Sequence, residues 1–244
     1  MRLIAAGTLV VLSCTAHAEP LPPSELVELA DFVMRESPSR AELASRAREL
    51  EPVIEAAEDE SARMLLSAMR EFLVGFGELG NGSVAEADRR FTSSVSLALG
   101  STRASESSEG YRVLADAYNQ LLDIRSPAYK VFNAAGARRA AVRAVELDPT
   151  NPLAHIAAAS YFVSAPAVAG GDLDRGRGHL RAAAQYGDGS DYQRFLVIVW
   201  EGRLAAAEGR PEEAVRLLSL AYGIYPDNWW LASVAEGLGV RLPR

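Results

Sequence analysis

Three glycines have the spacing of a nucleotide-binding loop. Gly75, Gly77 and Gly80 fit the Gly-x-Gly-x-x-Gly pattern with which a backbone loop approaches a pyrophosphate. That chemistry requires a strand before the glycines and a helix after them. Residues 61–79 instead have the apolar spacing of a helix that ends at these glycines. We therefore expect Gly75 to serve close helix packing, and we expect no bound cofactor.

Two histidines outside the N-terminal segment could take part in metal binding. A site built on His155 and His179 would need at least one carboxylate, and Asp172 and Asp174 are the nearest candidates. Both histidines fall on helices of one expected hairpin, and His155 occupies a position that usually holds a bulky packing residue. We interpret them as packing residues and predict no metal site.

Patterns for catalytic nucleophiles are missing from the sequence. It contains no Gly-x-Ser-x-Gly elbow, no His-Glu-x-x-His zinc motif and no phosphate-binding loop. Cys14 is the single cysteine, and it lies in a segment that we expect to be removed. We therefore predict a protein that is not an enzyme and has no catalytic residues.

The first residues have the pattern of an export signal. Arg2 precedes an apolar run at 3–12, and Ala-His-Ala at 16–18 forms a small-x-small cleavage site. Residues 1–18 are therefore predicted to be a signal peptide, and the mature chain to be periplasmic or secreted. The residues that end at Cys14 also resemble a bacterial lipobox. We expect contact with a membrane only if Cys14 carries that lipid.

Charge argues against nucleic acid as a partner. The chain has a formal net charge of −7, and no expected element concentrates the positive charge that nucleic acid requires. Arginines at 138, 139 and 143 share one helix, and those at 175, 177 and 181 share another. We expect both sets on a solvated outer face beside acidic residues. The alternative is a docking stripe for an acidic partner segment.

Small and bulky residues recur with a spacing typical of paired helices. One helix carries Tyr111-x2-Leu114-Ala115-x2-Tyr118, and its partner carries Ala137, Ala141 and Ala144 before Pro149. The second set of offsets returns at Ala214, Leu218 and Ala221 before Pro226. Small residues let antiparallel helices approach closely, and proline ends each hairpin. Ala144 and Ala221 should therefore be buried.

These positions resemble the tetratricopeptide-repeat family. The resemblance implies an all-α solenoid of stacked antiparallel hairpins with about 10–11 helices. It also implies a scaffold that binds a protein or peptide partner on its concave surface. We divide the mature chain into a divergent N-terminal helical hairpin at 19–60, which breaks near Pro52, a repeat array at 61–228, and a capping helix with a tail at 229–244.

Two hairpins are longer than their neighbours. The small residues of paired helices are 12 apart at Gly75 and Ala87, whereas Ala115 and Ala137 are 22 apart and Ala159 and Gly176 are 17 apart. Turns within hairpins emerge on one edge of a stack, so the extra residues at 119–130 and 163–171 should be neighbours. Their apolar residues are our candidates for partner binding: Leu121, Ile124, Tyr129, Val163, Pro166 and Val168. Alternatively, each insertion extends its helices and packs against the array.

Trp229 and Trp230 begin the last expected helix. Adjacent helical side chains point about 100° apart, so both indoles should not share one buried face. One should pack on the preceding hairpin, and the other is a candidate anchor for a partner.

A second resemblance supports an alternative function. Residues 152–183 include Tyr161-Phe162, Ala165-Pro166 and Gly170-Gly171-Asp172. This segment is similar to a hairpin of the helical-repeat T components associated with TRAP transporters, which are periplasmic lipoproteins. The resemblance implies a protein that pairs with a solute-binding partner and assists uptake of a small, apolar ligand.

Overall fold

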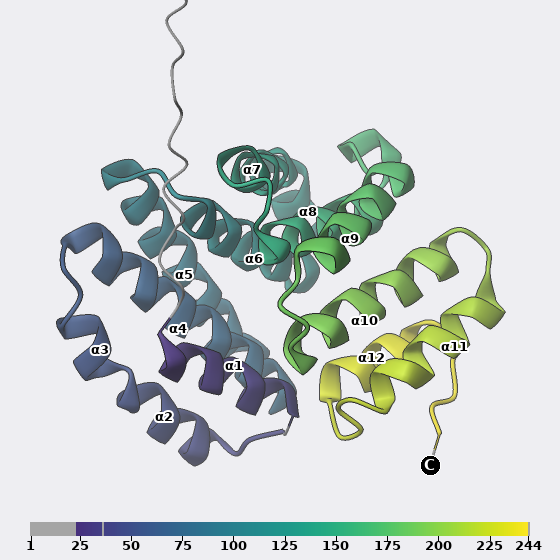
Figure 1. Cartoon of the computed structure of the whole chain (residues 1–244), viewed down its shortest axis with the longest axis horizontal. Coiled ribbons are helices and arrows are strands. Elements are labelled where there is room, and N and C mark those ends of the chain that lie inside the picture. The colour runs from purple at the N-terminus through teal and green to yellow at the C-terminus, as the bar shows by residue number, and fades with distance from the viewer. Residues whose placement is uncertain (1–22, 36, 244) are drawn as a thin grey trace, which may run out of the picture.

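The computed structural model describes residues 23–35 and 37–243, in which all regular structure is helical (Figure 1). The expected signal peptide at 1–18 and Cys14 lie outside the described residues. The helices are α1 (Ser24–Arg35), α2 (Arg40–Glu49), α3 (Glu51–Glu55), α4 (Glu60–Gly80), α5 (Val84–Ala104), α6 (Ser108–Ile124), α7 (Pro127–Leu147), α8 (Pro152–Ser164), the short 3-10 helix η1 (Ala167–Ala169), α9 (Leu173–Tyr186), α10 (Asp191–Ala207), α11 (Pro211–Tyr222) and α12 (Trp229–Gly237). None of these helices is long and apolar enough to cross a membrane.

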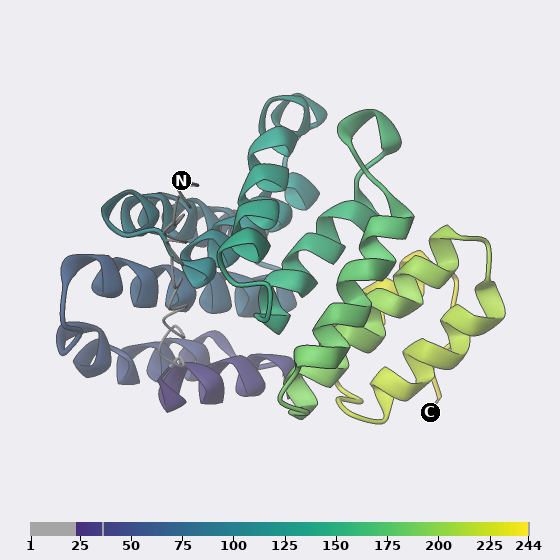
Figure 2. The same ribbon diagram turned by 45° about the horizontal axis from the view of Figure 1, so that its top comes forward.

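Four antiparallel hairpins form the body of the molecule. They pair α4 with α5, α6 with α7, α8 with α9, and α10 with α11, and successive hairpins stack on one another (Figures 1 and 2). The three N-terminal helices pack on α4. The break expected near Pro52 occurs at Leu50, between α2 and α3. The expected all-α class of stacked hairpins is therefore confirmed.

Short polar side chains begin many of the helices. Ser39 and Glu42 form a reciprocal capping box at the start of α2. The side chain of Asn151 accepts a hydrogen bond from the backbone N–H of Ala154, and Pro152 occupies the first turn of the same helix. These caps satisfy backbone donors that would otherwise lack partners, so the capped helices have a defined start.

The small residues lie where the helices approach most closely. Ala115, Ala137, Ala144, Ala159 and Ala221 are fully buried, which confirms the burial expected for Ala144 and Ala221. The glycines of the nucleotide-like motif likewise allow other helices to approach α4 closely. A Cβ atom at Gly75 would lie 2.8 Å from Cε1 of Phe91, and one at Gly77 would lie 2.8 Å from Cδ2 of Leu43. The motif therefore serves helix packing.

The two ends of the array meet. The hydroxyl of Tyr225 donates a hydrogen bond of 2.5 Å to Asp31, and the side-chain amide of Asn228 donates to the backbone oxygen of Met34. Helix α1 also contacts α10. The segment between α11 and α12 therefore binds α1, the first helix of the described chain, and the two ends of the array lie side by side (Figure 1).

Both tryptophans of α12 take part in this closure, and neither is an exposed anchor. The ring centroid of Phe76 lies 4.8 Å from that of Trp229 and 6.1 Å from that of Trp230. Both indoles are half-buried, and a role of either in binding stays a prediction. Phe76 contacts both rings, because it packs against the start of α12, where the two adjacent side chains diverge.

Candidate functional site

A pocket of about 860 Å³ lies on the inner side of the stacked hairpins. Its walls come from the first helix of each hairpin, α4, α6, α8 and α10, together with the start of α7 and the closing helix α12. One wall is aromatic and apolar; it consists of Phe72, Phe76, Tyr192, Leu196, Trp200 and Trp230. The contact between the chain ends bounds the pocket on this side.

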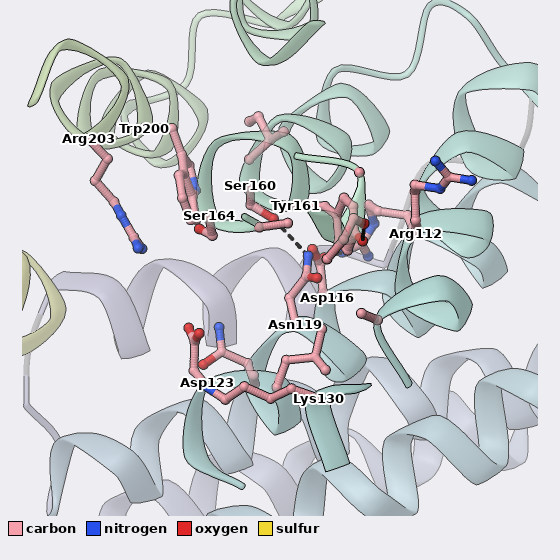
Figure 3. Close-up of a pocket in the computed structure, with 18 of the residues that line it drawn as sticks. Arg112, Asp116, Asn119, Asp123, Lys130, Ser160, Tyr161, Ser164, Trp200 and Arg203 are labelled. Carbon is pink, nitrogen blue, oxygen red and sulfur yellow. Dashed lines mark hydrogen bonds and ion pairs between the residues drawn. The ribbon is translucent and has the colours of Figure 1, made fainter. Parts of the chain in front are cut away.

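Three charged side chains enter the pocket on one side. Figure 3 shows Arg203 pointing into the space on the side where Asp123 and Lys130 lie. The guanidinium carbon of Arg203 lies 4.4 Å from the ring centre of Trp200, a cation–π contact. Burial lowers the pKa of Arg203, while the charge of Asp123 opposes that shift.

The cations of this group have unused hydrogen-bonding capacity. Within the described residues, neither Arg203 nor Lys130 forms an ion pair or a side-chain hydrogen bond. Surrounding protein also removes enough water from Asp123 to raise the pKa of its carboxyl. A partly desolvated guanidinium with free N–H groups is a favourable place for a carboxylate or another oxyanion.

A buried ionic cluster forms the floor of the pocket. The guanidinium of Arg112 donates to Glu109 at 2.8 Å and to Asp116 at 2.7 Å. Its side chain is only 8% exposed. Burial raises the pKa of Asp116 to about 6 despite the nearby Arg112. Burial likewise raises the pKa of the Tyr192 hydroxyl to about 12. These groups fix α6 and present polar atoms below the aromatic wall.

Hydrogen bonds position the other polar wall and the loop above it. The side-chain amide of Asn119 donates to Oγ of Ser160 at 2.8 Å, which joins α6 to α8 (Figure 3). The hydroxyl of Tyr161 donates to the backbone oxygen of Ala169 at 2.6 Å and holds the loop after α8. A Cβ at Gly171 would lie 1.8 Å from the backbone oxygen of Ala165, so the loop requires glycine there.

The candidate residues of the two long hairpins have different environments. Leu121 is 1% exposed and lies in the core, which leaves it no surface for a partner. The reason is that the first insertion adds helical turns: α6 continues to Ile124, and α7 begins at Pro127. Ile124, Tyr129 and Val163 are half-buried against the core.

The second insertion forms a true loop at the rim of the pocket. Pro166 is exposed and Val168 is 98% exposed. η1 in this loop contacts α7, the helix that begins within the first insertion, and Lys130 and Val168 line the same pocket. A role of either insertion in binding stays a prediction.

The main residues of the pocket were not found from the sequence. Arg112, Asp116, Asn119 and Asp123 follow a helical spacing in α6, and Tyr192, Leu196, Trp200 and Arg203 follow a similar spacing in α10. Both series lie on the inner face. That shared spacing was the available signal, and it becomes informative only once the inner face of each hairpin is known.

The two histidines form a hydrogen-bonded pair. Nδ1 of His155 lies 3.0 Å from Nδ1 of His179, and Nε2 of His155 lies 2.9 Å from the backbone oxygen of Pro149. A backbone oxygen can only accept, so Nε2 of His155 carries a proton and its Nδ1 accepts from His179. No group of three potential metal ligands occurs in the described part of the chain.

This pair should make stability depend on pH. Burial, together with the charges of His155 and Arg175, lowers the pKa of His179 to about 4. A lowered folded-state pKa contributes stability above the unfolded value of 6.5, and that contribution is lost as the pH falls through about 4. Because His179 is only partly buried, solvent screening keeps the effect below about 3 kcal/mol.

The variant His179→Gln should therefore lose less stability than the native chain between pH 7 and pH 4, as measured by urea unfolding. Carboxylates titrate in both proteins and cancel in the comparison. Parallel pH profiles for the two proteins would contradict the assignment.

Comparisons with known proteins find similarity at the level of structure. No family model and no curated protein sequence matches the chain. A solved structure that it resembles is that of a thermophilic tetratricopeptide-repeat protein from Thermus thermophilus. The identity is 17%, the alignment covers 83% of this chain and 100% of that chain, and the TM-score is 0.47.

Proposed function

We propose that this chain is a non-catalytic binding protein whose pocket holds a small amphipathic anion. The observation that carries the proposal is Arg203, an ion without a direct counter-ion among the described residues, placed beside the apolar wall. Pockets for small molecules are typically about 300–1,000 Å³, mostly apolar, with a few convergent polar groups. The cavity here, of about 860 Å³, fits that description.

The contact between the two ends of the array favours a small molecule over an extended peptide as the ligand. A peptide that runs along a repeat array needs a groove that is open at both ends. Here Trp230 and Phe76 bound the pocket where the ends of the array meet. The export pattern at 1–18 suggests that the protein works outside the cytoplasm. This function is close to the one implied by the resemblance to transporter-associated T components.

Displacement of a fluorescent anion tests the proposal. 8-Anilinonaphthalene-1-sulfonate should become fluorescent in the pocket, and dodecanoate should displace it much better than dodecanol does. Arg203→Gln should weaken dodecanoate binding about tenfold, since a charge-assisted hydrogen bond contributes about 1.5–3 kcal/mol. The matched control is Arg216→Gln on α11, whose side chain is 64% exposed. Equal affinities for native protein and Arg203→Gln, or equal displacement by dodecanol, would rule out this function.

A protein partner remains the second candidate, because the pocket offers more polar groups than a simple amphiphile needs. Gln120 and Ser164 line it and form no side-chain hydrogen bond within the described chain. Such groups suit the backbone of an inserted segment. A photo-crosslinking residue at position 164 should then capture a polypeptide, whereas one at the exposed Leu220 of α11 should not. Capture at both positions or at neither would count against this candidate.

A further inference from the structure

The first half of α7 carries an exposed apolar stripe. Ala128, Val131, Phe132 and Ala135 follow the spacing i, i+3, i+4 and i+7, and all four are exposed. Phe132 is 83% exposed and Val131 is 77% exposed. The spacing is that of a helix face that packs against something, but no described part of the chain covers it.

The loop after α8 adds a second apolar point beside this stripe. Val168 in η1 is 98% exposed, and η1 contacts α7. Figure 2 shows the α6–α7 turn and the α8–α9 loop as two neighbouring projections at one edge of the molecule. Val131 and Val168 also line the pocket, so these projections flank its mouth.

Positive charge surrounds the apolar residues. Lys130, Arg138 and Arg139 lie along the same part of α7, and α7 has no acidic residue before Glu146. None of these three cations forms an ion pair within the described residues. This arrangement contrasts with the chain as a whole, which has a net charge of −7.

The acidic residues around this edge are already engaged, with one exception. Asp88 pairs with Arg125, Asp174 pairs with Arg177, and the side chain of Asp172 caps α9. Asp123 is the exception, and it lies inside the pocket. Phe132 and Arg139 lie outside the pocket, while Val131, Val168, Lys130 and Arg138 line its mouth. The edge as a whole therefore presents apolar side chains and unpaired cations.

We propose that this edge, formed by Val131, Phe132, Val168, Lys130, Arg138 and Arg139, docks reversibly on a bilayer that contains anionic lipids. Aromatic and aliphatic side chains enter the headgroup boundary while cations bind the anionic surface. The contact needs no lipid at Cys14. It deepens the proposed function, because docking would place the mouth of the pocket against the membrane, a source of amphipathic anions.

A fluorophore at the edge tests the contact independently of the N-terminal segment. Cys14→Ser removes the single cysteine, and Val168→Cys then allows labelling with a nitrobenzoxadiazole dye at the rim. Vesicles of phosphatidylcholine with about a third phosphatidylglycerol should shift its emission to the blue. The same dye at Leu220→Cys on α11, an exposed position near the other end of its hairpin, should not respond.

Two variants outside the pocket lining separate the contributions. Phe132→Asp should weaken the response to these vesicles at least tenfold, and Arg139→Gln should weaken it on the order of fivefold, the effect of one surface cation. Both variants should bind dodecanoate as the native chain does, so failure of docking is distinguishable from failure of the pocket proposal. Equal responses at positions 168 and 220, or no response with anionic vesicles, would overturn the proposal. A native dimer that Phe132→Asp converts to a monomer would overturn it as well, because the edge would then join two copies.

Discussion

Replacing Arg112 with methionine is expected to lower the free energy of unfolding by about 3–5 kcal/mol, the usual cost of removing one partner from a buried ionic group. The side chain of Arg112 is 8% exposed, and its partners Glu109 and Asp116 are 14% and 20% exposed. Methionine has a similar volume but carries no charge. Glu109 and Asp116 would then lose the guanidinium that both of them bind in a site with little water, and urea unfolding measures the loss.

Two further variants give this prediction a control. Arg89→Met removes an arginine that is 69% exposed and pairs with Glu86, so its effect should stay within about 1 kcal/mol. Adding Glu109→Gln and Asp116→Asn to Arg112→Met should recover much of the lost stability, because neutral amides then replace both carboxyl groups. Similar losses for Arg112→Met and Arg89→Met would show that the cluster is solvated rather than buried.

Trp229→Ala is expected to cost about 3 kcal/mol, at the lower end of the range for a packed aromatic residue. The indole packs on Phe76 and on Gly80, where a Cβ would lie 2.6 Å from its Cδ1 atom. Its loss removes the closer of the two aromatic contacts between α12 and α4. Denaturant unfolding measures the stability, and small-angle X-ray scattering should show a larger radius of gyration.

A double-mutant cycle with glycine isolates this contact. Gly80→Ala should destabilise the native chain by about 1–3 kcal/mol through overpacking and should be nearly neutral once Trp229 is alanine. Gly178→Ala in α9 is the matched control. A Cβ there meets nothing within 4 Å, so this substitution should stabilise the helix by up to about 1 kcal/mol. Additive effects of Gly80→Ala and Trp229→Ala would contradict the packing of α12 on α4.

The hairpins could be predicted because their signal is local and periodic. Ala115 and Ala137 lie in the paired helices of one hairpin, and burial requires small side chains at both. In the structure, caps such as Asn151 and prolines such as Pro152 mark where the helices begin. Leu121 was wrongly predicted to lie on a binding surface, whereas it is buried in the core. An excess of residues between two small positions can be a loop or extra helical turns, and spacing alone does not separate the two.

The pocket and the closure could not be predicted, because they join residues that are distant in the sequence. Arg203 and Asp123 face one space only after three successive hairpins have stacked. The bond between Tyr225 and Asp31 spans 194 residues, and neither side chain belongs to a recognisable motif. Phe132 was overlooked because a large apolar side chain on a helix usually faces the core, and its exposure depends on the neighbouring hairpins.

The meeting of the two chain ends has a consequence for how the protein folds. In an open repeat array, each repeat touches only its neighbours, and folding can begin anywhere and spread along the stack. Here α1 obtains partners such as Tyr225 and Asn228 only after nearly the whole chain has been made. Contacts of such high sequence separation slow folding, because a long loop must close before they form. The hairpins should therefore fold early and quickly, and the closing of the ring should be a slow final step that makes the assembled structure unfold as a single cooperative unit.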